Sequence, residues 1–253
     1  MAYIDVHAHL DFFDDKKIAS SINKAKKAGV GIIVQSGISP VRIAKTLELI
    51  AKYKIVKASL GLYPVEMLDM DENEIESQIE IIRKSAKEGK IIAIGEVGMD
   101  LKEGKEAEKQ KKNFERFIDL ASELDLPIIV HSRKAELECI EILEKKKAKK
   151  VLMHCFSGNF KLVERAVKNK WYFSIPANVT FSEHFQKLVK EVPLSQILCE
   201  TDTPFLHPIK GKKDNEPANV VESYKKIAEI KGISLEECEK KIEENYKKLF
   251  LKN

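Results

Sequence analysis

Residues 91–100 read IIAIGEVGMD, a run of β-branched and other apolar residues that ends in glycine and acidic residues. The apolar part has no alternating polar position, as is typical of a parallel strand buried on both faces. Runs of this kind recur along the whole chain. We count eight, at residues 3–7, 31–35, 55–60, 91–94, 128–131, 151–155, 171–175 and 197–200.

Charged amphipathic segments separate these runs and predict helices. The segments span roughly residues 14–28, 40–53, 72–89, 105–125, 134–147, 160–169, 180–191 and 216–231. A final helix over 235–250 opens with Ser234 and Glu237, which fit a capping box. Eight β/α units in 253 residues predict an α/β fold, a TIM (β/α)8 barrel. A doubly wound open sheet is the alternative that periodicity does not separate from the barrel.

Composition narrows the possible organisation and partners. The chain has no linker-like stretch, internal repeat or composition break, which predicts one domain over residues 1–253. The formal net charge of +4 argues against a protein that coats nucleic acid non-specifically, although it permits a local basic rim. No apolar run reaches the roughly 18 residues of a membrane span. The first residues lack the pattern of a signal peptide, which predicts a cytoplasmic location.

The pair His7-x-His9 follows the first predicted strand. Residues two apart on a strand point the same way, so both imidazoles would aim at one point, which suits chelation of a single ion. The alternative is a pair of polar residues in a partly exposed loop. Asp5 shares the same face one step deeper and would orient a ligand from behind.

Polar residues also end the later strands. Glu96 follows a strand so apolar that burying its carboxylate is costly unless the group is paired or metal-bound. His131 and His154 end two further strands, and Asp202 follows the last one. Taken singly, these residues fit a salt bridge, hydrogen-bonded core histidines and a turn aspartate. In a barrel, however, all these strand ends open on one face, where active sites are built.

Together the six residues favour a metal site over coincidence. Two histidines and up to two carboxylates can hold one ion, and two histidines with a shared carboxylate can hold a second. The inventory suits a two-metal site with Glu96 as the bridge. The other two histidines fall outside this pattern: His184 is expected on a helix surface and His207 in loop structure.

The chain resembles the TatD family of metal-dependent deoxyribonucleases. The resemblance rests on Asp5-x-His7-x-His9-Leu10, Gly95-Glu96-Val97-Gly98-x-Asp100, His131-Ser-Arg133, His154-Cys-Phe-Ser-Gly158, Glu200-Thr-Asp202-Thr-Pro204 and Asn215-Glu216-Pro217. It implies a TIM barrel of the metal-dependent hydrolase superfamily and hydrolysis of DNA, often exonucleolytic from the 3′ end. It also implies two divalent ions, held by His7, His9, Glu96, His131, His154 and Asp202. DNA is the implied substrate, with no membrane and no obligate protein partner.

One position departs from the family pattern. The family commonly has Gly-x-His-Pro after the third strand, whereas this chain has Gly61-Leu62-Tyr63-Pro64. Tyr63 can still donate a hydrogen bond to a phosphate oxygen, but it carries no positive charge. The change puts rate, substrate choice and any third metal in question and leaves the two-ion core unchanged.

These residues suggest metal-assisted phosphodiester hydrolysis with Mg²⁺, Mn²⁺ or Zn²⁺. Glu96 would bridge the ions, and Asp202 would accept the proton of the attacking water. Arg133 and Ser157 would contact phosphate together with Tyr63. Phe156 or Tyr63 could stack against a base.

The sequence leaves two other functions open. One is hydrolysis of an amide, ester or lactone on the same barrel, such as an aminoacyl-tRNA ester. The relatives with such activities bridge their metals with a carboxylated lysine, whereas this chain has Glu96 and His131 at the corresponding strand ends. The other is a barrel that binds nucleic acid and has lost its chemistry, which the presence of all six candidate ligands disfavours.

Overall fold

Within residues 2–251, eight strands form one sheet in the order β1 to β8, which is also their order along the chain. The strand pairs are parallel, and helices alternate with the strands. Parallel strands in chain order with intervening helices are the topology of the TIM (β/α)8 barrel, the predicted fold class. Strands β4 (Ala93–Asp100), β6 (Val151–Met153) and β8 (Ile197–Glu200) are buried at every residue, as expected where helices cover one face and core side chains fill the other.

The computed structural model describes residues 2–251, which fall into two compact units. Unit 1 contains the residues up to Gln35 and those from Tyr172 onward, and unit 2 contains Ser36–Trp171. The organisation of residues 1–253 as one domain stays a prediction.

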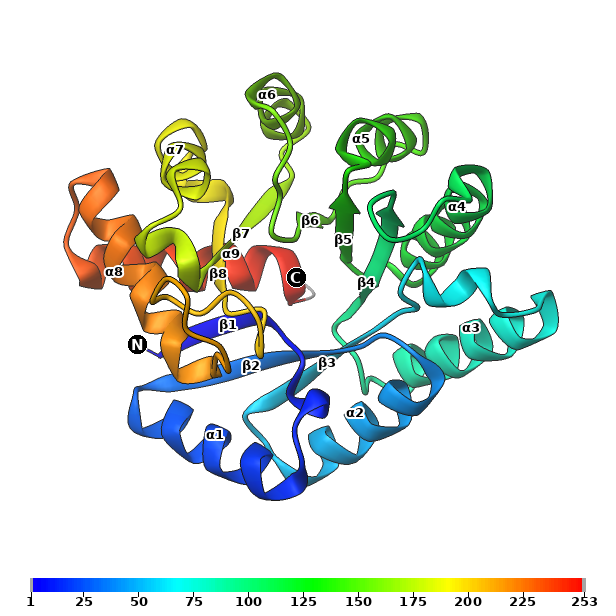
Figure 1. Cartoon of the computed structure of the whole chain (residues 1–253), viewed down its shortest axis with the longest axis horizontal. Helices are drawn as coiled ribbons and strands as arrows, with labels where there is room; N and C mark the ends of the chain where they lie inside the picture. Colours follow the sequence, from blue (N-terminus) through cyan, green and yellow to red (C-terminus); the bar gives the residue numbers. More distant parts are fainter. Residues whose placement is uncertain (1, 252–253) are drawn as a thin grey trace. The chain divides into compact units, whose positions relative to one another are not determined.

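Unit 1 holds both ends of the described chain. Its elements are β1 (Tyr3–Ala8), η1 (Leu10–Phe12), α1 (Asp15–Lys27), most of β2 (Val30–Gly37), β7 (Tyr172–Pro176), η3 (Ala177–Thr180), α7 (Glu183–Glu191), η4 (Leu194–Gln196), β8 (Ile197–Glu200), η5 (Pro217–Asn219), α8 (Val220–Lys231) and α9 (Leu235–Phe250). Figure 1 shows β1 beside β2 in blue, with α8 in orange and α9 in red. The predicted capping box of Ser234 and Glu237 is present at the start of α9.

Backbone hydrogen bonds join the first strand to the segment after the last one. The Asp202 N–H donates to the His7 carbonyl at 3.0 Å, and the His9 N–H donates to the Thr203 carbonyl at 2.8 Å. Ala8 and Thr203 also form a parallel bridge. Because the first and last strands of the order meet in this way, the open doubly wound sheet is excluded.

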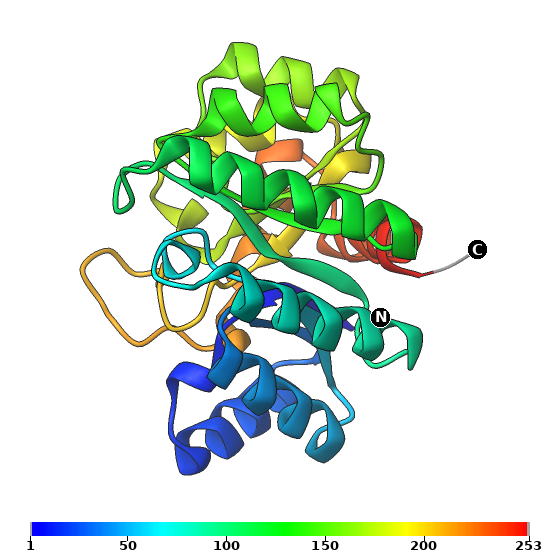
Figure 2. The same ribbon diagram turned by 90° about the vertical axis from the view of Figure 1, so that its right-hand side faces the viewer.

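Unit 2 contains the middle of the chain. Its elements are α2 (Pro40–Lys52), β3 (Val56–Leu60), η2 (Glu66–Leu68), α3 (Glu72–Lys87), β4 (Ala93–Asp100), α4 (Ala107–Leu124), β5 (Ile128–Arg133), α5 (Glu136–Lys145), β6 (Val151–Met153) and α6 (Phe160–Lys168). Helices α4, α5 and α6 lie on the same side of β4, β5 and β6 (Figure 1). Figure 2 shows α3 and α4 side by side, where Arg83 pairs with Glu123 and Arg116 pairs with Glu76.

The predicted elements all exist, and the main differences lie at their ends. β4 continues to Asp100, beyond the predicted end at Ile94, because residues 97–100 keep pairing with β5. Short 3₁₀ turns occupy the starts of two predicted helices, so α7 begins at Glu183 and α8 at Val220. Among the described residues, no helix is both long and apolar enough to cross a membrane.

Gly98 allows the close approach of β4 to β5, and we predict that Gly98→Ala strongly destabilises the fold. Gly98 is the register partner of His131, and a Cβ on it would lie 2.0 Å from the His131 carbonyl oxygen at a φ of +144°. Gly89→Ala is the matched control, because its φ is also positive (+69°) but nothing lies within 4 Å of the added Cβ. We expect a loss of about 1 kcal/mol for Gly89→Ala and about 3 kcal/mol or more for Gly98→Ala.

Urea unfolding followed by the fluorescence of Trp171, the single tryptophan, measures both losses. Equal losses for the two variants would show that the contact with His131 adds nothing to the backbone term.

Candidate functional site

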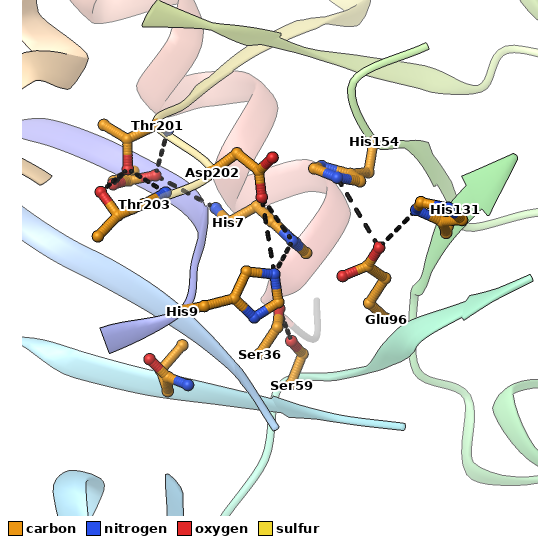
Figure 3. A network of polar contacts seen from close by, with 12 residues as sticks. His7, His9, Ser36, Ser59, Glu96, His131, His154, Thr201, Asp202 and Thr203 are labelled. Atoms are coloured by element: carbon orange, nitrogen blue, oxygen red, sulfur yellow. Dashed lines mark hydrogen bonds and ion pairs between the residues drawn. The ribbon is translucent and has the colours of Figure 1, made fainter. Parts of the chain in front are cut away.

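The first group of candidate ligands lies in unit 1, at the joint between β1 and β8 (Figure 3). We call His7, His9 and Asp202 the unit 1 cluster. The Nε2 atoms of His7 and His9 are 3.0 Å apart, and Asp202 Oδ1 lies 3.7 Å from the first and 3.6 Å from the second. Both histidines are buried. The sequence prediction that the H-x-H pair aims at one point is therefore confirmed, and Asp202 faces that point.

The geometry of this cluster suits a cation. Two nitrogen ligands at about 2.0–2.1 Å from a tetrahedral Zn²⁺ stand about 3.3 Å apart. The separation of the two imidazole nitrogens, 3.0 Å, is a few tenths of an ångström shorter, so a small movement of either ring would allow joint ligation of one ion. A carboxylate oxygen 3.6–3.7 Å from both nitrogens is placed for a third ligand position. Two buried imidazoles and one carboxylate form a donor set that Zn²⁺ and Mn²⁺ accept readily.

Asp5 lies two residues before His7 on β1, and its carboxyl group contacts both β1 and the segment after β8. Its Oδ1 accepts the backbone N–H of Thr201 at 2.9 Å and that of His7 at 3.3 Å, while its Oδ2 accepts the Thr201 hydroxyl at 2.6 Å. Complete burial raises the pKa of Asp5 to about 8, although the hydrogen bonds from Thr201 and His7 act in the opposite direction. The contact with His7 is made through the backbone, so Asp5 fixes the strand that carries the imidazole.

The second group lies in unit 2, and we call Glu96, His131 and His154 the unit 2 cluster (Figure 3). Glu96 Oε1 is 2.7 Å from His131 Nδ1 and 3.9 Å from His154 Nε2. One ligand atom from each of the three residues lies within 4.8 Å of the others, so the three can reach a single ion. Glu96 and His154 are buried, and a buried carboxylate in this setting requires such cationic or hydrogen-bonding partners.

Asp100 lies in one of the motifs that carry the family resemblance, but no role in the site was predicted for it from the sequence. It is fully buried, and its Oδ2 lies 3.1 Å from His131 Nε2 and accepts the Tyr63 hydroxyl at 2.7 Å. Its Oδ1 accepts the backbone N–H groups of Lys102 and Glu103 at 2.9 Å each. The available signal was parity, because a residue four positions after Glu96 on one strand returns to the same face. Asp100 therefore orients the ring whose other nitrogen meets Glu96.

The two carboxylates set the charge of His131. Burial lowers its pKa, but the hydrogen bonds with Asp100 and Glu96 outweigh burial and raise the pKa to about 9. For Asp100, burial raises the pKa, but the hydrogen bonds from His131 and Tyr63 outweigh it and hold the pKa below its ordinary value. Burial, and then the Asp100 carboxylate, raise the pKa of Tyr63, so this phenol stays protonated.

Each of the three predicted phosphate contacts already has a carboxylate partner. Tyr63 donates to Asp100, Arg133 Nη1 donates to Glu103 Oε1 at 2.6 Å, and Ser157 Oγ donates to Glu136 Oε1 at 2.9 Å. A phosphate would have to share or replace these acceptors, and the three roles stay predictions. Phe156 is 1% exposed, so the suggestion that its ring could stack on a base is wrong.

The remaining histidines take structural positions. His207 is buried in the loop after β8, where its Nδ1 accepts the backbone N–H of Ile209 at 2.9 Å. His184 lies on α7, and its ring packs edge-on against Phe185. The loop after β8, which contains His207, is held in place by the Asn215 amide, which donates to the Thr201 carbonyl at 2.9 Å.

The strand order defines a TIM barrel. The two clusters of histidines and carboxylates on it contain the residue types that bind metal ions. Residues 4–251 match the family model described as TatD related DNase. The chain is 36% identical over 254 residues to the uncharacterized metal-dependent hydrolase YabD of Bacillus subtilis, covering 97% of this chain and 98% of that protein. It is 36% identical over 262 residues to the human deoxyribonuclease TATDN3, covering 98% and 94%.

A solved structure agrees with this match. The crystal structure of YJJV, a TatD homolog from Escherichia coli K12, superposes with a TM-score of 0.88 at 26% identity, covering 99% of this chain and 98% of that one. The chain belongs to the TatD family.

We predict that His131 titrates at about 9 in the metal-free protein, because carboxylates meet both of its ring nitrogens. The stabilisation from its imidazolium is complete below the unfolded value of about 6.5 and is lost as the pH rises through 9. Asp100→Asn removes one negative partner and should lower the pKa of His131. Asp119→Asn, at an exposed ion pair on α4, is the control.

Histidine ring signals in NMR spectra recorded over a pH series in EDTA give these values. A pKa near 6.5 in the wild type, or an unchanged pKa in Asp100→Asn, would contradict this account of the cluster.

Proposed function

We propose that the protein is a metal-dependent phosphodiesterase that hydrolyses DNA, exonucleolytically and in the cytoplasm. One observation carries the proposal: the six residues chosen from the sequence as ligands gather into two clusters of three, each of metal-ligating composition. Membership of the TatD family supports the choice of reaction, because relatives are named deoxyribonuclease and metal-dependent hydrolase.

The proposed cofactors are two divalent ions, Mg²⁺, Mn²⁺ or Zn²⁺. The unit 1 cluster would hold one ion and the histidines of the unit 2 cluster the other, with Glu96 bridging the pair. The close approach of the His7 and His9 nitrogens supports the first position, and the contacts of Glu96 with His131 and His154 support the second. When bound, such ions polarise phosphoryl oxygens and acidify an attacking water.

The chain's own residues would then handle the proton and the phosphate. The Asp202 carboxylate accepts the proton of the attacking water and returns it to the leaving oxygen. The Arg133 guanidinium, which is 41% exposed, exchanges Glu103 for a phosphate oxygen, and Ser157 and Tyr63 add hydroxyl contacts. Asp100 keeps the ring of His131 in place throughout.

The small net charge of the chain bears on how many phosphates of the substrate the protein contacts. A formal net charge of +4, with 44 basic and 40 acidic residues, supplies little general attraction for a polyanion. We therefore propose contacts with only a few phosphates, as suits an enzyme acting on a DNA end or a flexible strand. The slope of log affinity against log salt reports that number.

Two other functions remain as outcomes of the tests. Hydrolysis of an ester such as that of aminoacyl-tRNA would use the same ligands and would show as ester cleavage without loss of DNA. A nucleic-acid-binding barrel without chemistry would bind DNA and hold little metal. The human relative is named a deoxyribonuclease, which supports a phosphodiester as the bond that is cleaved. The presence of Glu96, where relatives with amide or ester activity have a bridging carboxylated lysine, supports the same choice.

We expect Asp202→Asn to lower kcat on single-stranded DNA by roughly 10²–10⁴-fold, because it removes the proton acceptor and keeps the shape of the side chain. Rates of release of labelled nucleotides measure the loss, and metal content is determined on the same samples. Normal metal content together with the wild-type rate would show that Asp202 has no part in proton transfer.

The metal content of variants tests the ligand assignment directly. We expect two ions per chain in the wild type, one in His154→Ala and a strong loss of both in Glu96→Gln. His184→Ala, a histidine of α7 outside both clusters, should keep the wild-type content. The apparent affinity of the protein for metal ions should also rise as the pH increases towards 9, because His131 binds a metal ion only as the neutral imidazole. Unchanged metal content in both cluster variants would refute the assignment.

A further inference from the structure

We propose that Asn215 is a positioning residue for Asp202, the carboxylate that faces His7 and His9 in the unit 1 cluster. The Asn215 amide holds the backbone on both sides of Asp202, so that the carboxylate keeps its place beside the two imidazoles. This inference rests on the proposed function, which makes Asp202 a metal ligand and a proton acceptor. It gives a role to the Asn215-Glu216-Pro217 stretch, which neither cluster uses.

The backbone of Asp202 needs support from outside its own segment. Its φ is +54°, in the left-handed region that costs free energy for a residue with a Cβ, although aspartate tolerates it better than most. Leu206, in the same loop, has a φ of +50° and lacks that tolerance. Two left-handed residues so close together persist only where the surrounding contacts fix them.

The Asn215 side chain and backbone supply such contacts. Its Nδ2 donates to the Thr201 carbonyl at 2.9 Å and to the Leu206 carbonyl at 3.3 Å. The first carbonyl belongs to the peptide unit that leads into Asp202, and the second belongs to the other left-handed residue. The Asn215 backbone N–H also donates to the Pro204 carbonyl at 3.0 Å. One residue therefore holds the backbone both before and after Asp202.

The orientation of the Asn215 amide is itself fixed. Its Oδ1 accepts the backbone N–H of Glu216 at 2.9 Å and the Nδ2 of Asn219 at 2.8 Å. Because a backbone N–H only donates, the atom that faces it is the amide oxygen, and the amide nitrogen faces the two carbonyls. The side chain is fully buried and makes two donated and two accepted hydrogen bonds, its complete capacity. A buried amide with every hydrogen bond made is a rigid support.

The peptide unit between Thr201 and Asp202 is held at both of its polar groups. Its carbonyl oxygen accepts from Asn215, and its N–H donates to the His7 carbonyl at 3.0 Å. A planar unit held at both ends cannot turn, so the Cα of Asp202 stays fixed relative to β1. Loss of the Asn215 contact frees the carbonyl end, and Asp202 Oδ1 then loses its place 3.7 Å from His7 Nε2 and 3.6 Å from His9 Nε2.

Asn245 offers a matched control in the same unit. It lies on α9, is fully buried, and its Nδ2 donates to the Leu194 and Ile197 carbonyls at 2.7 Å and 2.8 Å. These carbonyls lie at the start of β8, whereas Asp202 lies beyond its end. Asn215→Ala and Asn245→Ala remove the same kind of contact, so both should lower the midpoint of urea unfolding. Only Asn215→Ala should disturb the unit 1 cluster.

Zinc binding tests the role of Asn215 without any nucleic acid. The ring signals of the six histidines, assigned through single substitutions, are followed by NMR while Zn²⁺ is added to the whole protein. The signals of His7 and His9 report the unit 1 position, and those of His131 and His154 report the unit 2 position. We expect Asn215→Ala to weaken binding at His7 and His9 by roughly 10–100-fold, the usual cost of losing a residue that orients a ligand. Binding at His131 and His154 should change less.

Two further variants make the result decisive. Asn245→Ala should bind Zn²⁺ as the wild type does at both positions. Asn219→Ala removes one of the two contacts that orient the Asn215 amide, and Asn219 is partly exposed, so this variant decides the question if Asn215→Ala does not fold. It should weaken binding at His7 and His9 by a smaller factor than Asn215→Ala.

The outcomes separate this inference from the proposed function. Zinc affinity at His7 and His9 that is unchanged in Asn215→Ala and Asn219→Ala, or weakened equally in Asn245→Ala, would overturn the role of Asn215. A wild-type protein that binds no Zn²⁺ at His7 and His9 would remove the two-metal function and this inference with it. Zinc binding that depends on Asn215, in a protein that leaves DNA intact, would retain this inference and remove the proposed function.

Discussion

Two backbone hydrogen bonds, from Asp202 to the His7 carbonyl and from His9 to the Thr203 carbonyl, are the constraint on which the unit 1 cluster depends. They place the segment after β8 in parallel register with β1, which is how two imidazoles and a carboxylate from opposite ends of the chain meet. Below them the buried Asp5 side chain accepts hydrogen bonds from Thr201 and His7, so side-chain contacts fix the register in addition to the backbone hydrogen bonds. A slip of one residue would turn both histidines away from Asp202.

The unit 2 cluster depends on a comparable constraint between β4 and β5. Gly98 lets the two strands approach, and Glu96 and Asp100 on either side of it both reach the ring of His131. One histidine held between two carboxylates cannot rotate without losing a partner. The result is a ligand with a defined orientation and a raised pKa, which links any metal binding to the loss of a proton.

Much of the fold follows from the sequence because parallel strands and amphipathic helices have different periods. The final helix was predicted over its observed range, 235–250, and the His7–His9 pair was predicted to converge because strand parity requires it. What periodicity does not contain is the pairing between strands. Strand parity places Asp100 on the same face as Glu96, but the extension of β4 to Asp100 and the contact of Asp100 with His131 depend on pairing with β5.

The most direct measurement of the central claim is a comparison of bonds cleaved by one preparation of the whole protein. Labelled single-stranded DNA, duplex DNA, RNA and an aminoacyl ester are incubated with protein stripped in EDTA and then supplied with Mg²⁺, Mn²⁺ or Zn²⁺. The account predicts stepwise shortening of DNA from its 3′ end when a divalent ion is supplied, and intact DNA in EDTA. Cleavage of the ester alone, or DNA cleavage that persists in EDTA, would contradict it.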